Sequence, residues 1–529
     1  MSKVFTNDLQ SPEFKHRFNK FDLLFLIGAA IFLYATLFQL PFTPFFYEGD
    51  HQIFLLDGWR MHDDEIIYRD FFQFTYPGTS VLYYFLFNLF GLHFSILNWV
   101  ILAIGLGGTY FCLEISRRLS NYRLLVYLPP ILYLFFGFRW FGIDGSHRML
   151  SPLAIAAAVW LLLDKCTLLR LAGAGAMCAV ASFFTQQRGV VAVGALTIFV
   201  LYEGWTTRQN WRRLLLAAFC LNSAFSVTLG GLCAYFIIAA GFDNFYQSTF
   251  VFLQYYRYDS FNNYSSFLQE LSPLTRSQNF LALAVHCFHY FITPLSLIVF
   301  FTLFAFKKSD ADWRFWRKPL LVAMVSGFLT LATLGAPLAG RLYQVSIFGL
   351  ILFGWLLDRF FRRQKTFKAA IYASYAVLIV LSVATVVRNQ TYSTLTVFDA
   401  PTGRSVFLTS DAAARYLWLK ERTAPGDFVF ETYQPTVNFP LLLRNPTRIS
   451  HLRDTAYTRP EQITDAVAKL KANPPKFILW NKNWSKPQSV RAADDSLGLL
   501  YDYLLESYQP VEPTYEHFGL VIEIWERKH

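Results

Sequence analysis

An acidic pair of residues follows the first long apolar stretch of the sequence. Glu48 and Asp50 lie two positions apart in the run Tyr47-Glu48-Gly49-Asp50-His51. In an extended segment their side chains would share one face. Two carboxylates placed in this way can bind a divalent cation, or one of them can accept a proton as a general base. The alternative is that both are solvated loop acids.

A second polar segment, the short run from Gly142 to Arg148, combines the acid Asp144 with His147 and Arg148. Glycines on both sides of Asp144 allow the backbone to bend and to approach a ligand. These residues are therefore candidates for a binding pocket. The alternative is a turn aspartate beside an interfacial arginine, with His147 as a hydrogen-bonded structural residue.

Two further arginines lie in short turns between apolar stretches. Arg188 precedes Gly189, and Arg341 is followed two positions later by Tyr343. A guanidinium group binds phosphate oxygens through two parallel donors, so both arginines are candidates for holding a lipid phosphate. The alternative is ordinary snorkelling of a long cationic side chain toward water.

The composition indicates that membrane helices position these residues. Of 529 residues, 54% are hydrophobic and 19% aromatic, the mean hydropathy is +0.32, and 16% are charged, whereas a soluble domain carries about a quarter. The net charge of +11 does not indicate nucleic-acid binding, because the basic residues fall in short loops between apolar runs. The six cysteines show no Cys-x-x-Cys spacing, so we expect neither disulfides nor a zinc site.

Eleven apolar stretches are candidates to cross a bilayer, which takes about 20 residues. They lie near residues 22–41, 95–116, 124–141, 149–164, 171–186, 189–205, 214–240, 281–306, 319–337, 342–357 and 369–388. The first is expected to be a retained helix, because no small-residue cleavage signal follows it. The apolar run Val81–Gly91 is too short to span comfortably, so we interpret it as an interfacial helix. A short or tilted span is the alternative.

The loops between these stretches alternate in charge. Basic residues collect in 15–20, 117–123, 165–170, 208–213, 307–318 and 359–368, which the positive-inside rule places in the cytoplasm. The loops 42–94, 142–148, 187–188, 241–280, 338–341 and the tail after 389 are then exoplasmic. The sequence therefore predicts a multi-pass protein of the inner (plasma) membrane, with a cytoplasmic N-terminus and a periplasmic C-terminus.

The tail differs from the rest in its pattern. Helices are expected over 411–422, 461–471 and 499–506, and strands over 428–430, 476–480 and 520–525. Alternating strands and helices indicate a small α/β domain. The fold class is thus a polytopic α-helical membrane domain, residues 1–388 with its first exoplasmic loop at 42–94, and an exoplasmic α/β domain, residues 389–529.

Taken in order, these motifs resemble the GT-C superfamily of integral-membrane, polyprenyl-phosphate-sugar-dependent glycosyltransferases. The similarity is greatest to bacterial relatives of protein O-mannosyltransferases and to the lipid A aminoarabinose transferase. The motifs that carry it are Asp50-His51, Leu56-Asp57-Gly58-Trp59-Arg60-Met61, Tyr68-Arg69-Asp70-Phe71, Pro77, Leu89-Phe90-Gly91, Arg117-Arg118, the segment from Arg139 to Arg148, Thr185-Gln186-Gln187-Arg188 and Arg341-Leu342-Tyr343. Each motif is degenerate, and it is their order and sidedness that carry the resemblance.

The resemblance implies transfer of a hexose or pentose from a polyprenyl-phosphate donor to a lipid, glycan or protein acceptor among membrane lipids. It implies Asp50 as the catalytic carboxylate. Arg188, Arg341 and Arg148 would hold the donor phosphate, and Glu48, His51, Asp144, His147 and Tyr343 would form the pocket. Two residues depart from the family pattern: His51 stands where Glu is frequent, and Arg188 where Lys is usual. The His51 departure leaves the use of a divalent cation open, so no cofactor is certain. The Arg188 departure keeps the positive charge that a phosphate site needs.

Three other functions remain open from the sequence. A transporter or flippase of lipid-linked glycans would favour charged residues within spans and inverted repeats, neither of which is evident in the sequence. A non-catalytic component of an envelope complex would be consistent with degenerate motifs. A transferase similar to O-antigen ligases would be a different enzyme on a similar architecture.

Overall fold

The computed structural model describes residues 18–528 except 121, 257–262, 277–278, 307–312, 336, 362–363, 393, 488–489 and 518. Parts of the basic loops 15–20, 307–318 and 359–368 therefore lie outside the described residues. The chain divides into two compact units, each assembled from separate stretches. We call Met1–Thr36, Val100–Leu232 and Asp259–Arg388 the helical unit, and Leu37–Trp99, Cys233–Tyr258 and Asn389–His529 the mixed unit.

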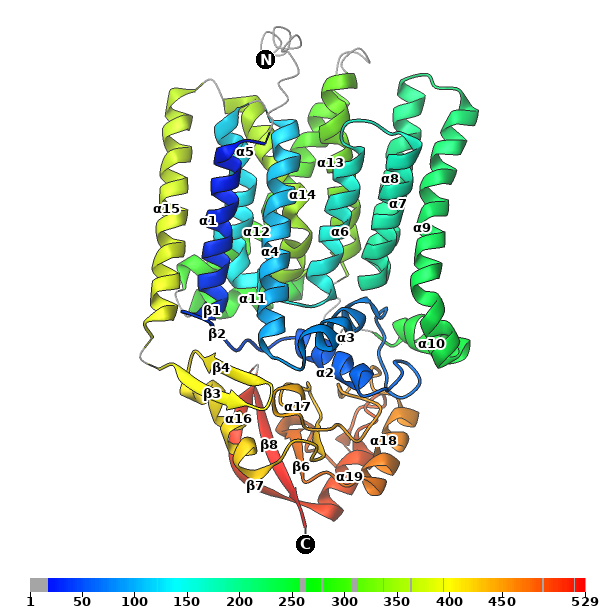
Figure 1. The fold of residues 1–529 in the computed structure, drawn as a ribbon, viewed down its shortest axis with the longest axis vertical. Coiled ribbons are helices and arrows are strands. Elements are labelled where there is room, and N and C mark those ends of the chain that lie inside the picture. The colour runs from blue at the N-terminus through cyan, green and yellow to red at the C-terminus, as the bar shows by residue number, and fades with distance from the viewer. Residues whose placement is uncertain are drawn as a thin grey trace. The chain divides into compact units, whose positions relative to one another are not determined.

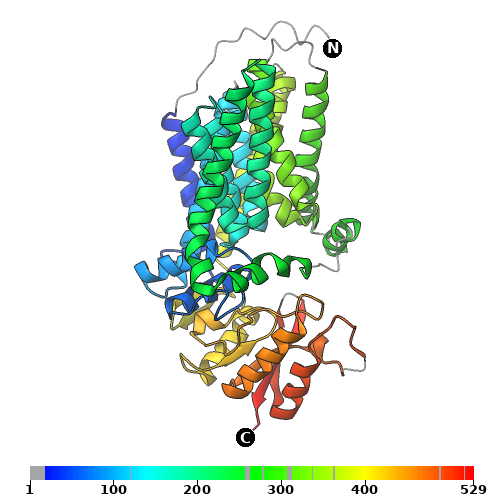
Figure 2. The same ribbon diagram turned by 90° about the vertical axis from the view of Figure 1, so that its right-hand side faces the viewer.

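Helices occupy all eleven predicted spans, and in the helical unit they run side by side (Figures 1 and 2). Among the described residues, nine helical stretches are long and apolar enough to cross a membrane. They are α1 (Lys20–Leu37), α4 (Ser95–Leu119), α5 (Arg123–Ile131) continued by the π-helix η2 (Leu132–Gly142), α8 (Gln186–Thr206), α9 (Trp211–Ala240), α12 (Phe280–Ala305), α13 (Trp313–Thr333), α14 (Ala339–Phe361) and α15 (Lys365–Gln390). The other two, α6 (His147–Leu162) and α7 (Leu168–Phe184), are shorter, so the count of eleven spans stays a prediction.

Helix α14 is the most buried of these spans, with 78% of its apolar window inside the protein. It packs against α5, η2, α6, α12 and α13. The neighbouring stretch α5–η2 contains Pro129 and Pro130, which lack backbone N–H donors. Hydroxyl groups of later helices bind backbone carbonyls of this stretch: Tyr375 binds that of Leu124, Tyr343 that of Tyr133 and Ser382 that of Phe135. These bonds tie the α5–η2 stretch to α14 and α15.

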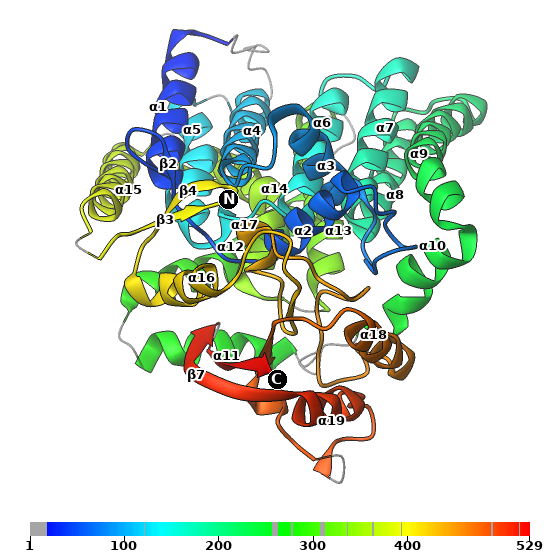
Figure 3. The ribbon, with the colours of Figure 1, turned by 60° about the horizontal axis from the view of Figure 1, so that its bottom comes forward.

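The mixed unit contains a four-stranded sheet in the order β5-β6-β8-β7. Strands β5 (Val429–Glu431) and β6 (Phe477–Asn481) are parallel, whereas β8 (Leu520–Arg527) is antiparallel to β6 and to β7 (Tyr508–His517). Helices α18 (Pro460–Ala472) and α19 (Gly498–Ser507) cover one face (Figure 3), where Ile478 and Trp480 enter the core. Helix α16 (Ser410–Arg422) packs on the other face through Trp418 and Phe477, because successive strand residues alternate in direction. The predicted α/β pattern of the tail is present.

The first loop belongs to the same unit as the tail. It contributes the pair β1 (Phe38–Gln39) and β2 (Thr43–Pro44), helix α2 (His51–His62) and helix α3 (Gly78–Phe90), while the tail adds the hairpin β3 (Thr396–Ala400)–β4 (Gly403–Phe407) and the short helices α17 (Asn438–Leu441) and η5 (Lys482–Trp484). Phe45 pairs with Val406, and α2 packs on α17. The apolar run Val81–Gly91 lies in α3, which is too short to meet the length of a span. Helix α10 (Phe242–Thr249) and η3 (Val251–Gln254) complete the unit.

Candidate functional site

Three arginines of the helical unit lie in the first turns of three helices. Arg148 is the second residue of α6, and Arg188 and Arg341 are the third residues of α8 and α14. The first turn of a helix presents backbone N–H groups without helical partners and a partial positive charge. Together with a guanidinium group, such a turn favours an anion. Each predicted phosphate-binding residue is therefore on an element end that suits that role.

Arg188 is the buried member of this set, with 7% of its surface exposed. Its guanidinium donates to the carbonyl of Arg148, to Gln344 Oε1 at 2.8 Å and to Ser151 Oγ at 3.4 Å. All of these acceptors are neutral. The charges of Arg148 and Arg341 act on Arg188, and so does that of Asp144. The structure thus brings together these four charged residues, which the sequence places in three separate loops.

Asp144 and His147 join the starts of two of these helices. The Asp144 carboxylate accepts hydrogen bonds from the backbone N–H of Ser146 at 2.8 Å and from its hydroxyl at 2.9 Å. Ser146 in turn caps α6. The carbonyl of His147 accepts a hydrogen bond from the hydroxyl of Thr185, the residue before α8, at 3.0 Å. These contacts fix Arg148 relative to Arg188.

Tyr343 has a packing role in this structure. Its side chain is fully buried and stacks on Tyr133 with ring centroids 5.3 Å apart. Its hydroxyl donates to the carbonyl of Tyr133 at 3.2 Å, and its ring meets that of His289 edge to face. Tyr343 therefore holds α14, and with it Arg341, against the α5–η2 stretch.

Glu270 is a residue of this region that the sequence did not single out. It lies on α11 (Asn263–Arg276), and its carboxylate accepts hydrogen bonds from the N–H of Ala339 at 2.9 Å and from the hydroxyl of Tyr290. A carboxylate at this position stabilises the start of α14. Glu270 is one of three acids in the 241–280 loop and lies 69 positions from Ala339, so the sequence gives no signal that pairs the two.

In the mixed unit, Glu48 belongs to a charged network with the tail. Its Oε1 lies 2.8 Å from Arg415 Nη2, its Oε2 lies 3.0 Å from His517 Nδ1, and the hydroxyl of Tyr416 donates to it. Burial alone would raise the pKa of Glu48, but the Arg415 charge and the bonds from His517 and Tyr416 outweigh it and lower the pKa to about 2. Glu48 is therefore an anchor that stays ionised.

Asp50 is half-buried at the position just before α2. Its side chain makes no capping bond to that helix, and Gln434 donates to its Oδ1 at 3.5 Å. Its charge also acts on the buried His451, whose pKa is lowered to about 4 by burial and by Arg453. The Asp50 carboxylate is thus not engaged in starting the helix that follows it.

The other members of the predicted first-loop pocket do not gather around Asp50. The backbone turns helical at Asp50 (φ −57°, ψ −22°), so the extended geometry that would align it with Glu48 is absent there. His51 is buried, and its Nε2 lies 3.0 Å from the carbonyl of Tyr47. Both carboxylate oxygens of Glu48 already have partners, Arg415 and Tyr416 at Oε1 and His517 at Oε2. Glu48 and Asp50 therefore do not fit a two-carboxylate cation site.

Other potential metal ligands among the described residues are also dispersed. Within the part of the chain that the structure describes, no three His, Cys, Asp or Glu side chains are grouped to hold a metal ion. We therefore derive no step through a cation.

Aromatic residues of the 241–280 loop that lie in the mixed unit are part of its packing. Phe245 meets Tyr68 with centroids 5.3 Å apart, and Phe252 meets Phe72 at 4.7 Å and Tyr457 at 5.1 Å. These rings hold the first loop and the tail in one core.

No family model matches the sequence, and no curated protein matches it significantly. Among solved structures, the chain is similar to ArnT from Cupriavidus metallidurans bound to undecaprenyl phosphate, with 12% identity, a TM-score of 0.47 and coverage of 96% of this chain and 98% of ArnT. Its similarity to the apo state of ArnT has a TM-score of 0.45 at 12% identity, over 96% of this chain and 97% of ArnT.

The chain is also similar to the oligosaccharyltransferase of Archaeoglobus fulgidus, solved in complex with Zn and sulfate. Here the identity is 10% and the TM-score 0.46, over 95% of this chain and 73% of the other. Both proteins are GT-C glycosyltransferases, the class that the sequence resembles. At these low TM-scores the similarity carries no conclusion about activity, which we infer from the residues.

Proposed function

We propose that this protein transfers a sugar from a polyprenyl-phosphate-linked donor to an acceptor at the outer face of the membrane. The observation that carries this proposal is the convergence of Arg148 and Arg341 on the buried Arg188, at the starts of three helices. A buried guanidinium with neutral acceptors is costly unless an anion balances it. A lipid-linked phosphate is the anion that suits arginines on apolar helices.

The chemistry follows from where charge develops. An acceptor hydroxyl oxygen attacks the anomeric carbon, the bond from that carbon to the phosphate oxygen breaks, and polyprenyl phosphate leaves with the bonding electrons. The arginines stabilise the negative charge that develops on the phosphate, which is the most effective place for preorganised donors. Asp50 takes the proton from the acceptor hydroxyl as general base. Asp144 and His147 position α6 and α8, and no cofactor is invoked.

Replacing Asp50 tests the catalytic assignment. We expect Asp50→Asn to lower the rate of transfer by about 10²- to 10⁴-fold, because the amide cannot accept the proton. The measurement is transfer from a defined polyprenyl-phosphate sugar by purified protein in detergent. Asp494→Asn, which changes an exposed aspartate of the same unit, should keep full activity. An Asp50→Asn enzyme within a few-fold of wild type would refute the assignment.

The orientation is also a proposal: a cytoplasmic N-terminus and an exoplasmic C-terminus. It follows from an odd number of spans and from the loop charges. A reporter that is active only outside the cytoplasm, fused after His529, should be active. Activity of a cytoplasmic reporter at the same position would show that the span count is wrong by one.

A further inference from the structure

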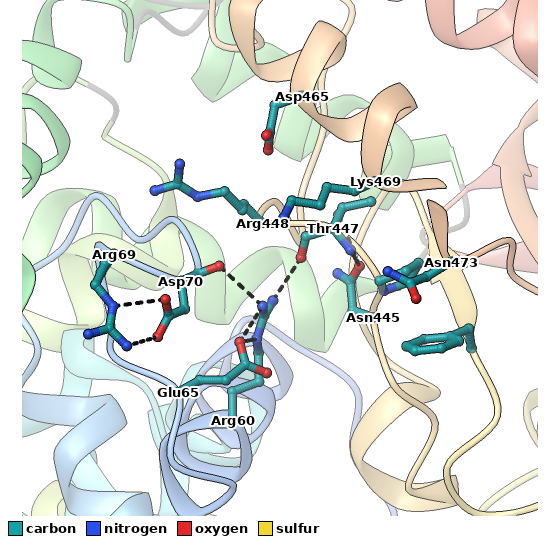
Figure 4. Close-up of a pocket in the computed structure, with 12 residues that line it drawn as sticks. Arg60, Glu65, Arg69, Asp70, Asn445, Thr447, Arg448, Asp465, Lys469 and Asn473 are labelled. Carbon is teal, nitrogen blue, oxygen red and sulfur yellow. Dashed lines mark hydrogen bonds and ion pairs between the residues drawn. The ribbon is translucent and has the colours of Figure 1, made fainter. Parts of the chain in front are cut away.

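A polar pocket of about 400 Å³ lies within the mixed unit, between the loop that follows α2 and helix α18 (Figure 4). Residues of the first loop and of the tail line it together. They are Arg60, Glu65, Arg69, Asp70, Phe428, Asn445, Pro446, Thr447, Arg448, Asp465, Lys469 and Asn473. None of them is used in the transfer chemistry described above.

Part of the charge in this pocket is balanced by internal ion pairs. Arg60 donates to Glu65 through two nitrogens, at 2.8 and 2.6 Å, and to the carbonyl of Thr447 at 3.0 Å. Arg69 donates to both oxygens of Asp70, at 2.9 and 2.8 Å. These four charged side chains form a fixed wall that joins the first loop to the tail.

Arg448 is held in place chiefly by backbone contacts. Its carbonyl accepts from the N–H of Phe72 at 2.7 Å, and its Nη2 donates to the carbonyl of Tyr68 at 3.2 Å. Tyr68 is buried with φ at 72°, a left-handed conformation that a bulky residue adopts only where the surroundings enforce it. The strained turn fixes the guanidinium, and most of its five N–H donors remain for a ligand.

Two charged groups on α18 complete the opposite wall. Asp465 and Lys469 are one helical turn apart and line the pocket. In the part of the chain that the structure describes, neither side chain makes a hydrogen bond or an ion pair. Arg448 and Lys469 thus offer two cationic groups, and Asp465 offers an acceptor, within one cavity.

A second pocket of about 280 Å³ continues from the first. The two share Arg60, Glu65, Phe428 and Asn445, and Trp59 lines the second. Phe428 is partly exposed and gives both pockets an aromatic surface. Volumes of about 400 and 280 Å³ leave room for more than one small polar ring.

We propose that this site binds an anionic sugar within a glycan. Asp465 suits sugar hydroxyl groups because its carboxylate accepts their hydrogen bonds, and Asn473 suits them because its amide both accepts and donates. Phe428 suits the apolar face of a pyranose ring. Arg448 and Lys469 bind the acidic substituent, a phosphate or a carboxylate. The role of this site in docking the acceptor glycan rests on the proposed transfer function. Its ability to bind an anionic sugar does not depend on that function.

Binding to the full-length protein in detergent, with no donor present, tests the site directly. The probes are glucose 6-phosphate, glucuronate, glucose and inorganic phosphate, titrated by calorimetry. We expect glucose 6-phosphate or glucuronate to bind more tightly than glucose and more tightly than inorganic phosphate. The preferred probe identifies the acidic group. Equal binding of inorganic phosphate and both acidic sugars would overturn the assignment to a sugar.

Variants locate the binding. Lys469→Ala removes an exposed side chain without structural contacts, so the fold should persist, and it should weaken the preferred acidic sugar about tenfold, as for a lost charged hydrogen bond. Asp465→Ala should weaken both the acidic sugar and glucose. Lys420→Ala, an exposed lysine on α16 outside the pocket, should change nothing. Unchanged binding in both Lys469→Ala and Asp465→Ala would overturn the proposal.

Transfer kinetics separate this site from the proposed activity. If both are correct, Lys469→Ala raises the KM for an acceptor that carries an acidic sugar and leaves the KM for the donor unchanged. A wild-type protein that binds the sugar but transfers nothing would contradict the transfer function alone. If Lys469→Ala transfers the sugar with an unchanged KM for the acceptor, only the acceptor role of the pocket would be contradicted, and the transfer function would stand.

Discussion

Two buried arginines, one in each unit, are balanced in different ways. Arg415 of the mixed unit is 3% exposed and lies 2.8 Å from Glu48 and 3.9 Å from Glu431. Arg188 of the helical unit is 7% exposed, donates to neutral acceptors, and has two other arginines as charged neighbours. The first guanidinium is neutralised by the fold, whereas the second has two arginines and one acid, Asp144, as charged neighbours. Arg415 therefore supports structure, and we propose that Arg188 prepares a place for an anion.

The largest effect should come from Arg415. Arg415→Ala leaves the buried Glu431 and the half-buried Glu48 without their cation, and breaking such a pair costs roughly 3–5 kcal/mol of the free energy of unfolding. Denaturant unfolding of the whole protein, followed by tryptophan fluorescence, measures the loss. Arg422→Ala, on the same helix with an exposed partner, should cost about 0.5 kcal/mol or less. If Arg415→Ala were as stable as Arg422→Ala, Arg415 would not be a structural arginine, and its contrast with Arg188 would be lost.

Arg188→Ala should show the opposite pattern. We expect unfolding to be little changed and kcat/KM for the polyprenyl-phosphate donor to fall about 100-fold, as for other lost donors to a developing negative charge. Arg188→Lys should lose less, because it keeps the charge but not the planar fork. Arg170→Ala, also a third helical residue, on α7, is the matched control and should be nearly silent.

Arg341→Ala sharpens the same comparison. If Arg188 and Arg341 hold one phosphate, the losses in the double variant should not add. Donor titrations at fixed acceptor measure each loss. Wild-type donor kinetics in both single variants would show that the arginines only neighbour one another and that the phosphate is bound elsewhere, with Arg148 the next residue to test.

The smallest expected effect is the pH dependence of stability caused by Asp57. It extends the comparison of the two buried arginines to a buried acid. The Asp57 carboxylate is fully buried, accepts from Gln73 at 2.8 Å and from Ser80 at 3.0 Å, and burial raises its pKa to about 7. Between its ordinary value near 4 and about 7, the folded state keeps a proton that the unfolded state releases, so stability falls as pH rises through this window. From pH 6 to 7 the loss is at most ~1.4 kcal/mol.

Asp57→Asn cannot ionise, so its free energy of unfolding should not decline between pH 6 and 7 in the way the wild type does. Denaturant unfolding at the two pH values measures the difference. If Asp57→Asn shows the same pH dependence of stability as the wild type, a titratable group other than Asp57 causes the loss between pH 6 and 7. Arg188, unlike Asp57, cannot relieve its burial by losing a proton at these pH values, which supports the proposal that an anionic ligand balances it.

Much of this arrangement could be predicted from the sequence, because apolar length and the strand–helix pattern are local signals. The predicted helices and strands of the tail are present, and the three arginines selected from their turns lie together. The partners of Glu48 could not be predicted, since Arg415 is 367 positions away and only the packing of the tail brings it near. Strand β7 was missed because Pro510 and Pro513 interrupt its pattern, which an edge strand tolerates.

The hydroxyl contacts on the α5–η2 stretch have a consequence for how the protein is made. The carbonyls of Leu124, Tyr133 and Phe135 obtain their partners from side chains 251, 210 and 247 residues later. During synthesis, the third apolar stretch enters the membrane long before those hydroxyl groups exist, so until then it rests on its own intrahelical hydrogen bonds. A chain truncated before α14 would therefore lack the side chains that tie this stretch to the bundle, and would be a substrate for quality-control proteases.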